Sequence, residues 1–177
     1  MSLEIINLDI VANTVDGRYG VSIPFSSGLF LLRMENSHGK STCMNAIAYA
    51  LGMEKALGLG SAKIPFPPSL TRALTTKEGK EVNVISSFVS LKVKNKNGRV
   101  ANLKRNITGY ENENVIYIDE TLVGSDDAKT SGSYFLHREG DTDREKGFYK
   151  WLSVFMEWDL PQVPNHSGKE TPLYPAV

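Results

Sequence analysis

The chain has 177 residues, of which 41% are hydrophobic and 23% are charged, so it is long enough for one domain with a substantial core. Twenty basic and twenty acidic side chains cancel, which excludes a protein whose overall charge attracts nucleic acid. The single cysteine excludes an internal disulfide, and no apolar run reaches the roughly 18 residues of a membrane helix. We therefore expect a cytoplasmic protein with no membrane partner.

Three β-strands are predicted before residue 35. Residues 3–11 alternate between apolar and polar side chains, and residues 19–23 follow after an Asp-Gly turn, so the two segments predict a hairpin. Residues 29–34, LFLLRM, form a nearly continuous apolar run. Such a run predicts a strand that is buried on both faces.

A helix is predicted after Lys40. Its apolar residues recur at helical spacing, and they are Met44, Ile47, Ala48 and Leu51. Either Gly52 or Gly58 is expected to end the helix. Residues 58–68 are rich in Gly, Ser and Pro and predict an irregular loop.

The loop between the third strand and this helix matches the last three fixed positions of the phosphate-binding pattern G-x-x-x-x-G-K-[ST]. These positions are Gly39, Lys40 and Ser41, whereas the first fixed glycine is replaced by Met34. In this pattern the glycines let backbone N–H groups cradle phosphate oxygens, the lysine adds positive charge, and the hydroxyl holds Mg²⁺. The strand and helix on either side are the context that the motif requires.

The second half of the chain predicts a β-meander over residues 82–118. Asn97-Gly98 divides its first two strands and predicts a type I′ hairpin turn. Residues 126–132 are polar and predict a mobile loop.

A second helix is predicted over residues 141–159, with Thr142 as N-cap and Glu145 as its capping-box partner. Its apolar stripe is expected to pack into the core, and it comprises Phe148, Leu152, Phe155 and Met156. Residues 161–177 are rich in proline and predict an extended tail.

The N-terminal hairpin, the phosphate loop and the helix ending in AIAYALG resemble the N-terminal lobe of SMC-type ABC ATPase heads, including the relatives that repair DNA double-strand breaks. The matching positions are Asn36, Gly39, Lys40, Ser41, Thr42, Ala46, Ile47, Ala50, Leu51 and Gly52. The resemblance covers residues 1–125 and implies an α/β fold: a P-loop lobe with an antiparallel β-layer, here followed by a C-terminal helix. It also implies that ATP is bound by Asn36, Ser37, His38, Gly39, Lys40, Ser41 and Thr42, and that Ser41 ligates Mg²⁺.

In that family the hydrolytic groups lie far downstream, beyond a coiled coil, and a second head completes the site. No signature motif or heptad segment is visible here. We therefore expect residues 1–160 to form a partial ATPase head and residues 161–177 to continue into further sequence. A second ATPase head and DNA are the implied partners, and ATP hydrolysis is expected only in the completed assembly.

Two features leave alternatives open. Residues 115–120, VIYIDE, fit the pattern of a magnesium-orienting Asp119 and a water-activating Glu120, but they also fit an ordinary meander strand. Six basic residues gather on the predicted hairpin, and they are Lys92, Lys94, Lys96, Arg99, Lys104 and Arg105. They predict either a surface that contacts DNA phosphates or an ordinary solvated strand face.

The alternative functions follow from these features. The chain could be a self-contained small P-loop NTPase or kinase that uses Asp119, or a non-catalytic interaction module with a vestigial P-loop. Cys43 and the histidines lack zinc-ligand spacing. Cys43 itself is expected to be a small packing residue.

Overall fold

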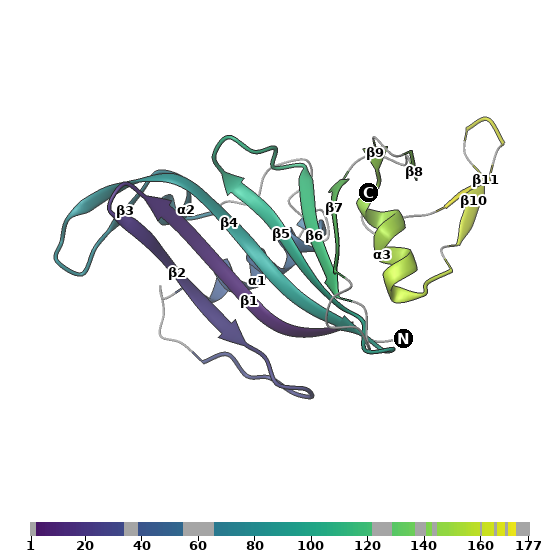
Figure 1. Cartoon of the computed structure of the whole chain (residues 1–177), viewed down its shortest axis with the longest axis horizontal. Helices are drawn as coiled ribbons and strands as arrows, with labels where there is room; N and C mark the ends of the chain where they lie inside the picture. Colours follow the sequence, from purple (N-terminus) through teal and green to yellow (C-terminus); the bar gives the residue numbers. More distant parts are fainter. Residues whose placement is uncertain are drawn as a thin grey trace.

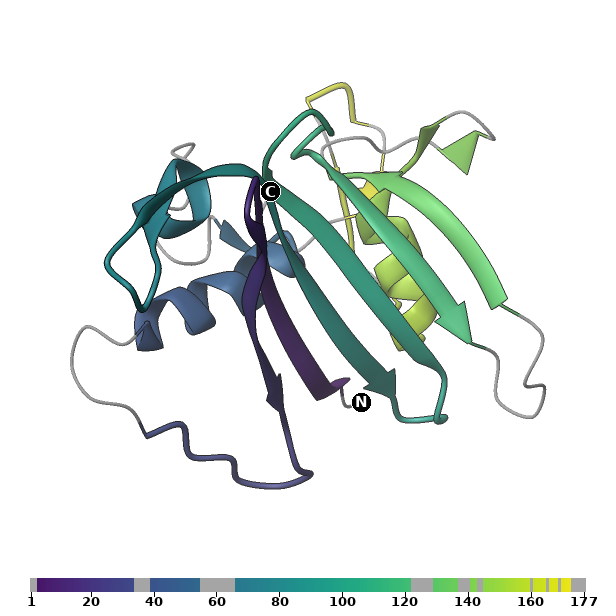
Figure 2. The same ribbon diagram turned by 60° about the vertical axis from the view of Figure 1, so that its left-hand side comes forward.

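A computed structural model describes residues 3–33, 39–54, 66–121, 129–136, 141–142, 145–159, 161–164, 166–168 and 170–172. In it, a large antiparallel sheet carries the helices on one of its faces (Figures 1 and 2). The fold is thus mixed α/β, as expected.

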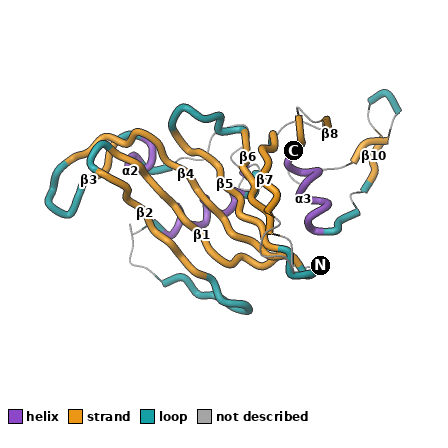
Figure 3. The backbone as a smooth tube through the Cα atoms, viewed as in Figure 1, coloured by secondary structure: helices purple, strands orange, loops and turns teal. Residues whose placement is uncertain are grey.

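The main sheet has seven strands in the order β2-β1-β4-β5-β6-β7, and β3 pairs with one end of β4 (Figure 3). All of its pairings are antiparallel. The strands are β1 (Leu3–Thr14), β2 (Gly17–Pro24), β3 (Ala73–Thr75), β4 (Glu81–Asn95), β5 (Val100–Thr108), β6 (Val115–Thr121) and β7 (Lys129–Phe135). The predicted N-terminal hairpin and the meander are therefore confirmed.

Within the described residues, three helices pack with the sheet: α1 (Lys40–Ala50), α2 (Pro68–Thr71) and α3 (Phe148–Met156). Alternate residues of the central strands point toward them, and those side chains are buried because they share one face of the pleated sheet. Fully buried members of this core include Leu8, Val89, Leu91, Val93, Leu103, Ile116, Phe148 and Phe155. The stripe predicted for the C-terminal helix is therefore confirmed as core.

Residues 29–33 form no strand, so that prediction is wrong for them. Leu29 is 97% exposed and Leu31 is 84% exposed, while Phe30 rests against Phe25 with ring centroids 4.7 Å apart. A strand buried on both faces needs neighbouring strands and covering layers. None of the described strands pairs with this segment, and Met34 lies outside the described residues.

Helix α1 is confirmed, but its buried face only partly matches the predicted one, of which Leu51 lies in the core and Ile47 packs against it. Cys43, Ala46, Tyr49 and Ala50 face the core, whereas Met44 is 63% exposed. The small side chains lie against the sheet because they let the helix backbone approach it closely. Gly52 follows the helix with φ of 67°, which confirms the earlier of the two predicted ends.

Local turn chemistry differs from prediction at the Asn97-Gly98 hairpin. Only Gly98 has a positive φ, 83°, and its N–H donates to the carbonyl of Asn95. The loop is therefore a type I turn followed by a left-handed glycine, and not the predicted type I′ turn. The amide oxygen of Asn95 accepts hydrogen bonds from the N–H groups of Asn97 and Arg99, which favours this longer loop.

The C-terminal part contains more strands than predicted. Residues 129–132 of the predicted mobile loop belong to β7, and residues 126–128 lie outside the described part of the chain. The predicted start of the second helix is wrong: β8 (Asp141–Thr142) pairs with β9 (Glu145–Lys146), and α3 begins only after Gly147. The expected tail contains a small hairpin of β10 (Gln162–Pro164) and β11 (Glu170–Pro172). Most of the predicted loop 58–68 also lies outside the described residues.

Candidate functional site

The phosphate motif reaches the described structure at Gly39, directly before helix α1. Gly39 has φ of 89°, a left-handed conformation that glycine adopts without steric cost. Its carbonyl accepts the hydrogen bond of the Cys43 N–H at 3.0 Å, which closes the first helical turn. Within the described residues no side chain caps this helix end, and its first turn holds no acidic residue. The amino end therefore presents backbone donors and a positive dipole end, as anion binding requires.

Lys40, Ser41 and Thr42 form the first turn of α1. The side chain of Ser41 is exposed, and Lys40 and Thr42 are half-buried. Among the described residues, the nearest atom to the position that a Cβ would take at Gly39 is Thr42 Cβ, at 4.0 Å. An exposed hydroxyl beside a lysine suits Mg²⁺, which keeps most of its water and phosphate ligands. The remaining predicted contacts, Asn36, Ser37 and His38, lie outside the described residues.

The opposite end of α1 is held by a buried arginine that the sequence placed on the wrong surface. Arg105 on β5 is 3% exposed, and its Nη1 donates to the carbonyl of Tyr49 at 2.7 Å. The same nitrogen lies 2.6 Å from Glu54 Oε1, and Nε donates to the carbonyl of Glu113 at 2.7 Å. The guanidinium also stacks on the Tyr49 ring, 3.7 Å from its centroid. Arg105 therefore belongs to the core face and not to the basic surface.

Two tyrosine hydroxyls complete this cluster. Tyr49 Oη donates to the carbonyl of Asn106, and Tyr149 Oη donates to the carbonyl of Gly52, each at 2.5 Å. Burial raises the pKa of Tyr49 and of Tyr149 to about 12, so both phenols stay protonated donors at neutral pH. The end of α1 is thus tied to β5 and to α3. Sequence analysis missed this cluster, although a charged residue at the inward position after Ala101 and Leu103 was a signal of it.

Asp119 and Glu120 lie in β6, inside the antiparallel meander. Asp119 Oδ1 accepts a hydrogen bond from Ser131 Oγ at 2.6 Å, and Glu120 Oε1 lies 2.5 Å from Arg99 Nη2. Helix α1 packs against β1, β4 and β5, whereas β6 lies farther along the sheet (Figure 2). The structure therefore does not bring this acidic pair together with Lys40.

The basic residues proposed for DNA contact are mostly paired with carboxylates. Lys94 Nζ lies 3.1 Å from Glu4 Oε2, Lys96 Nζ lies 2.9 Å from Glu157 Oε2, and Arg99 bonds Glu120. Lys92 is exposed on β4, and Lys104 lies over the Phe88 ring. The hairpin is thus less positive than its basic residues alone suggest.

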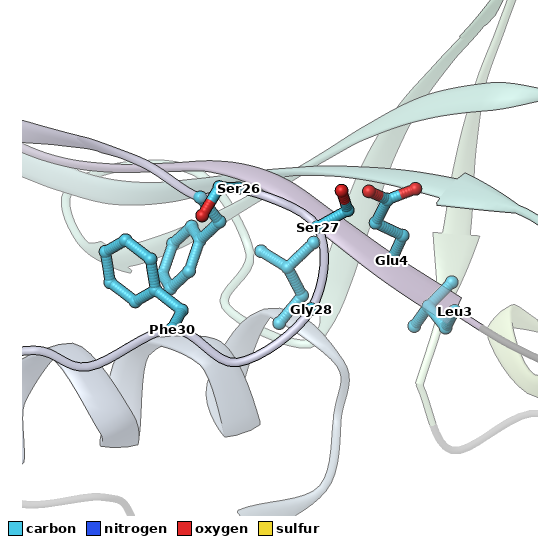
Figure 4. Close-up of a pocket in the computed structure, with 8 residues that line it drawn as sticks. Leu3, Glu4, Ser26, Ser27, Gly28 and Phe30 are labelled. Carbon is cyan, nitrogen blue, oxygen red and sulfur yellow. The ribbon is translucent and has the colours of Figure 1, made fainter.

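An open pocket of about 450 Å³ lies beside the loop that leads toward the motif (Figure 4). Its walls come from the start of β1 and from the segment after β2, and they comprise Leu3, Glu4, Ile5, Phe25, Ser26, Ser27, Gly28 and Phe30. None of the motif residues Gly39 to Thr42 lines it. We therefore do not place the phosphate site in this pocket.

We find no second candidate site at Cys43 or among the described metal-ligating side chains. Burial raises the pKa of the Cys43 thiol, in keeping with a packing role. The described residues contain no cluster of His, Cys, Asp or Glu that could hold a metal ion. Among the described helices, none has both the length and the apolar character needed to cross a membrane.

A family model described as an AAA domain matches residues 2–151, which is most of the chain. No curated protein and no solved structure matches the chain. The family match supports nucleotide binding by a P-loop domain of the ATPase type, and the mixed α/β structure fits such a fold.

Proposed function

Because the chain belongs to the AAA domain family of P-loop ATPases, we propose that it is the ATP-binding N-terminal part of an SMC-like ATPase that acts on DNA. The observation that carries the proposal is the Gly-Lys-Ser-Thr sequence at the amino end of α1, inside the matched residues. Backbone donors, a lysine and an exposed hydroxyl are adjacent in this first turn. This is the donor set that a magnesium-bound triphosphate needs.

Each residue of the motif has a proposed role. The N–H groups of the first turn and of Gly39 bind phosphate oxygens, and Lys40 neutralises the β- and γ-phosphates. Ser41 Oγ ligates Mg²⁺, and Thr42 adds a hydroxyl next to it. Asn36, Ser37 and His38 complete the loop around the phosphates.

We further propose that hydrolysis requires groups from a C-terminal lobe and from a second ATPase head. The exposed apolar segment 29–33 supports this view. Its sequence is typical of a buried strand, but Leu29 and Leu31 are exposed and no described strand pairs with the segment. A further lobe or a partner would cover this apolar surface. Residues 1–160 would form the partial head, and residues 161–177 would lead out of it. Its DNA-facing residues would include Lys92, Lys94 and Lys96, whereas Arg99 is held by the buried carboxylate of Glu120.

Isothermal titration calorimetry of ATP, with and without Mg²⁺, tests the nucleotide site. Lys40→Ala removes a charge-assisted contact worth about 1.5–3 kcal/mol, so we expect the affinity to fall by about 10- to 100-fold. Lys77→Ala is the matched control, because Lys77 is an exposed lysine in the turn between β3 and β4. Equal ATP affinity in the wild type and the Lys40→Ala variant would reject the site.

A further inference from the structure

We propose that Arg105 is a positioning residue for the nucleotide site, and that it acts from the far end of helix α1. The inference rests on the proposed function, since it concerns how the Gly39–Thr42 turn is held in place. Arg105 fixes the carboxyl end of the helix through the Tyr49 carbonyl and through Glu54. The phosphate-binding turn is the other end of the same rigid element.

The packing of α1 explains why an anchor at its end is needed. Its buried face is formed by Tyr49 near the carboxyl end and by the small side chains of Cys43, Ala46 and Ala50. Interdigitating side chains set the direction in which a helix packs, and the small side chains of α1 offer little for such interdigitation. Directional hydrogen bonds at the carboxyl end therefore fix the direction of the helix, which the apolar contact alone leaves variable.

The contacts of Arg105 meet this need on three sides. Its guanidinium bonds the Tyr49 carbonyl inside the helix, the Glu54 carboxylate beyond it and the Glu113 carbonyl after β5. A planar fork makes several directed bonds at once, which a lysine ammonium cannot reproduce. A cation at this end also interacts favourably with the helix dipole.

The length of α1 converts a small change of direction into a displacement at the motif. Eleven residues at about 1.5 Å each make a helix of about 16 Å, so a tilt of about 5° moves its amino end by about 1.4 Å. Hydrogen bonds between N–H groups and phosphate oxygens weaken steeply over such a distance. Loss of Arg105 should therefore weaken nucleotide binding although Arg105 lies at the other end of the helix.

The chain offers a matched control in Arg99. Arg99 also bonds a buried carboxylate, that of Glu120, and lies 5.4 Å from the centre of the Phe155 ring. These two contacts of the Arg99 side chain lie on β6 and α3, and neither lies on α1. Replacing either arginine by methionine removes a comparable ion pair and ring contact.

The experiment compares Arg105→Met, Arg105→Lys and Arg99→Met with the wild type by two measurements. Hydrogen exchange reports the protection of the amide at Cys43, which closes the first turn, and calorimetry reports ATP affinity. We expect Arg105→Met to speed exchange in the first turn and to weaken ATP binding by about 10-fold, with Arg105→Lys in between. Arg99→Met should lower global stability and leave both quantities unchanged.

If Arg105→Met fails to fold, Glu54→Gln replaces it, because this variant removes the ion pair and keeps the shape. First-turn exchange and ATP affinity that stay at wild-type values in folded Arg105 or Glu54 variants would overturn the inference. The same changes in Arg99→Met would overturn it too, because they would reflect general destabilisation. A wild type that binds no ATP would refute the proposed function, and the exchange measurement would still decide the role of Arg105.

Discussion

Replacing Gly52 with alanine should destabilise the protein through two separable effects. The first is backbone strain, because Gly52 has φ of 67° and a left-handed alanine costs about 1–2 kcal/mol. The second is crowding, because the new Cβ would lie 2.3 Å from Leu136 Cδ2 and 3.1 Å from Tyr149 Oη. Overpacking of this kind costs about 1–3 kcal/mol, so we expect a total loss of about 2–5 kcal/mol.

The crowding effect also reaches the anchor of α1. Tyr149 Oη donates to the carbonyl of Gly52 itself, so a side chain that moves away from the new methyl group loses this hydrogen bond. Leu136 is 1% exposed and has little space to shift. We therefore expect the upper part of the range.

Urea unfolding, followed by far-ultraviolet circular dichroism and tryptophan fluorescence, measures the change in the free energy of unfolding. Gly79→Ala is the matched control. Gly79 also has a positive φ, 80°, but no atom lies within 4 Å of the position that the new Cβ would take. It should cost only the strain, about 1–2 kcal/mol. Equal losses in the two variants would refute the argument from crowding, and a loss below about 1 kcal/mol in Gly52→Ala would refute both parts.

Two further predictions concern charge. Because burial raises the pKa of Tyr49 and Tyr149 from 10.0 to about 12, the stability that they contribute is complete below about pH 10 and is lost as the pH rises toward 12. Each tyrosine accounts for up to about 2–3 kcal/mol, so urea unfolding from pH 8 to 11.5 should show a shallower decline in Tyr149→Phe, and an unchanged profile would contradict the assignment. Glu4→Gln combined with Glu157→Gln frees Lys94 and Lys96 from their ion pairs, so it should tighten DNA binding and steepen its salt dependence in fluorescence anisotropy. Unchanged affinity and slope would show that this surface does not contact DNA.

Sequence patterns predicted the strands whose stability depends on their immediate neighbours. The hairpin of β1 and β2 and the meander from β4 to β6 alternate clearly and are joined by short turns. The pattern of residues 29–33 was as strong, but an apolar run shows only that a segment suits burial. It does not show whether a covering layer exists, and Leu29 and Leu31 are exposed here.

Other errors arose where local signals compete with tertiary pairing. Thr142 and Glu145 fit a capping box, yet they pair with each other in a two-stranded sheet, and the helix begins after Gly147. Strand β7 is rich in Ser, Thr and Gly, so its composition gave no strand signal, and pairing with β6 supplies its stability.

The motif at the amino end of α1 could be predicted from the sequence, but the contacts of Arg105 at the carboxyl end could not. Gly39, Lys40 and Ser41 are adjacent in sequence, so a short pattern reveals them. The contact between Arg105 and Tyr49 spans 56 positions, and only the folded sheet brings them together. The sequence placed Arg105 with the surface lysines because its charge and its closeness to a turn outweighed its alternation with the buried residues Ala101 and Leu103.

The ladder between β1 and β4 has a consequence for how the chain accommodates changes in length. It is the junction at which the β1–β2 hairpin joins the meander, and the chain leaves the sheet after β2 and joins it again at β3. The motif and α1 lie within this closed excursion. The entropy of closing such a loop rises slowly, by about 0.6 kcal/mol for each doubling of its length. Insertions between α1 and α2 should therefore cost little, because neither the ladder nor the contact between Arg105 and the end of α1 depends on the length of the connection.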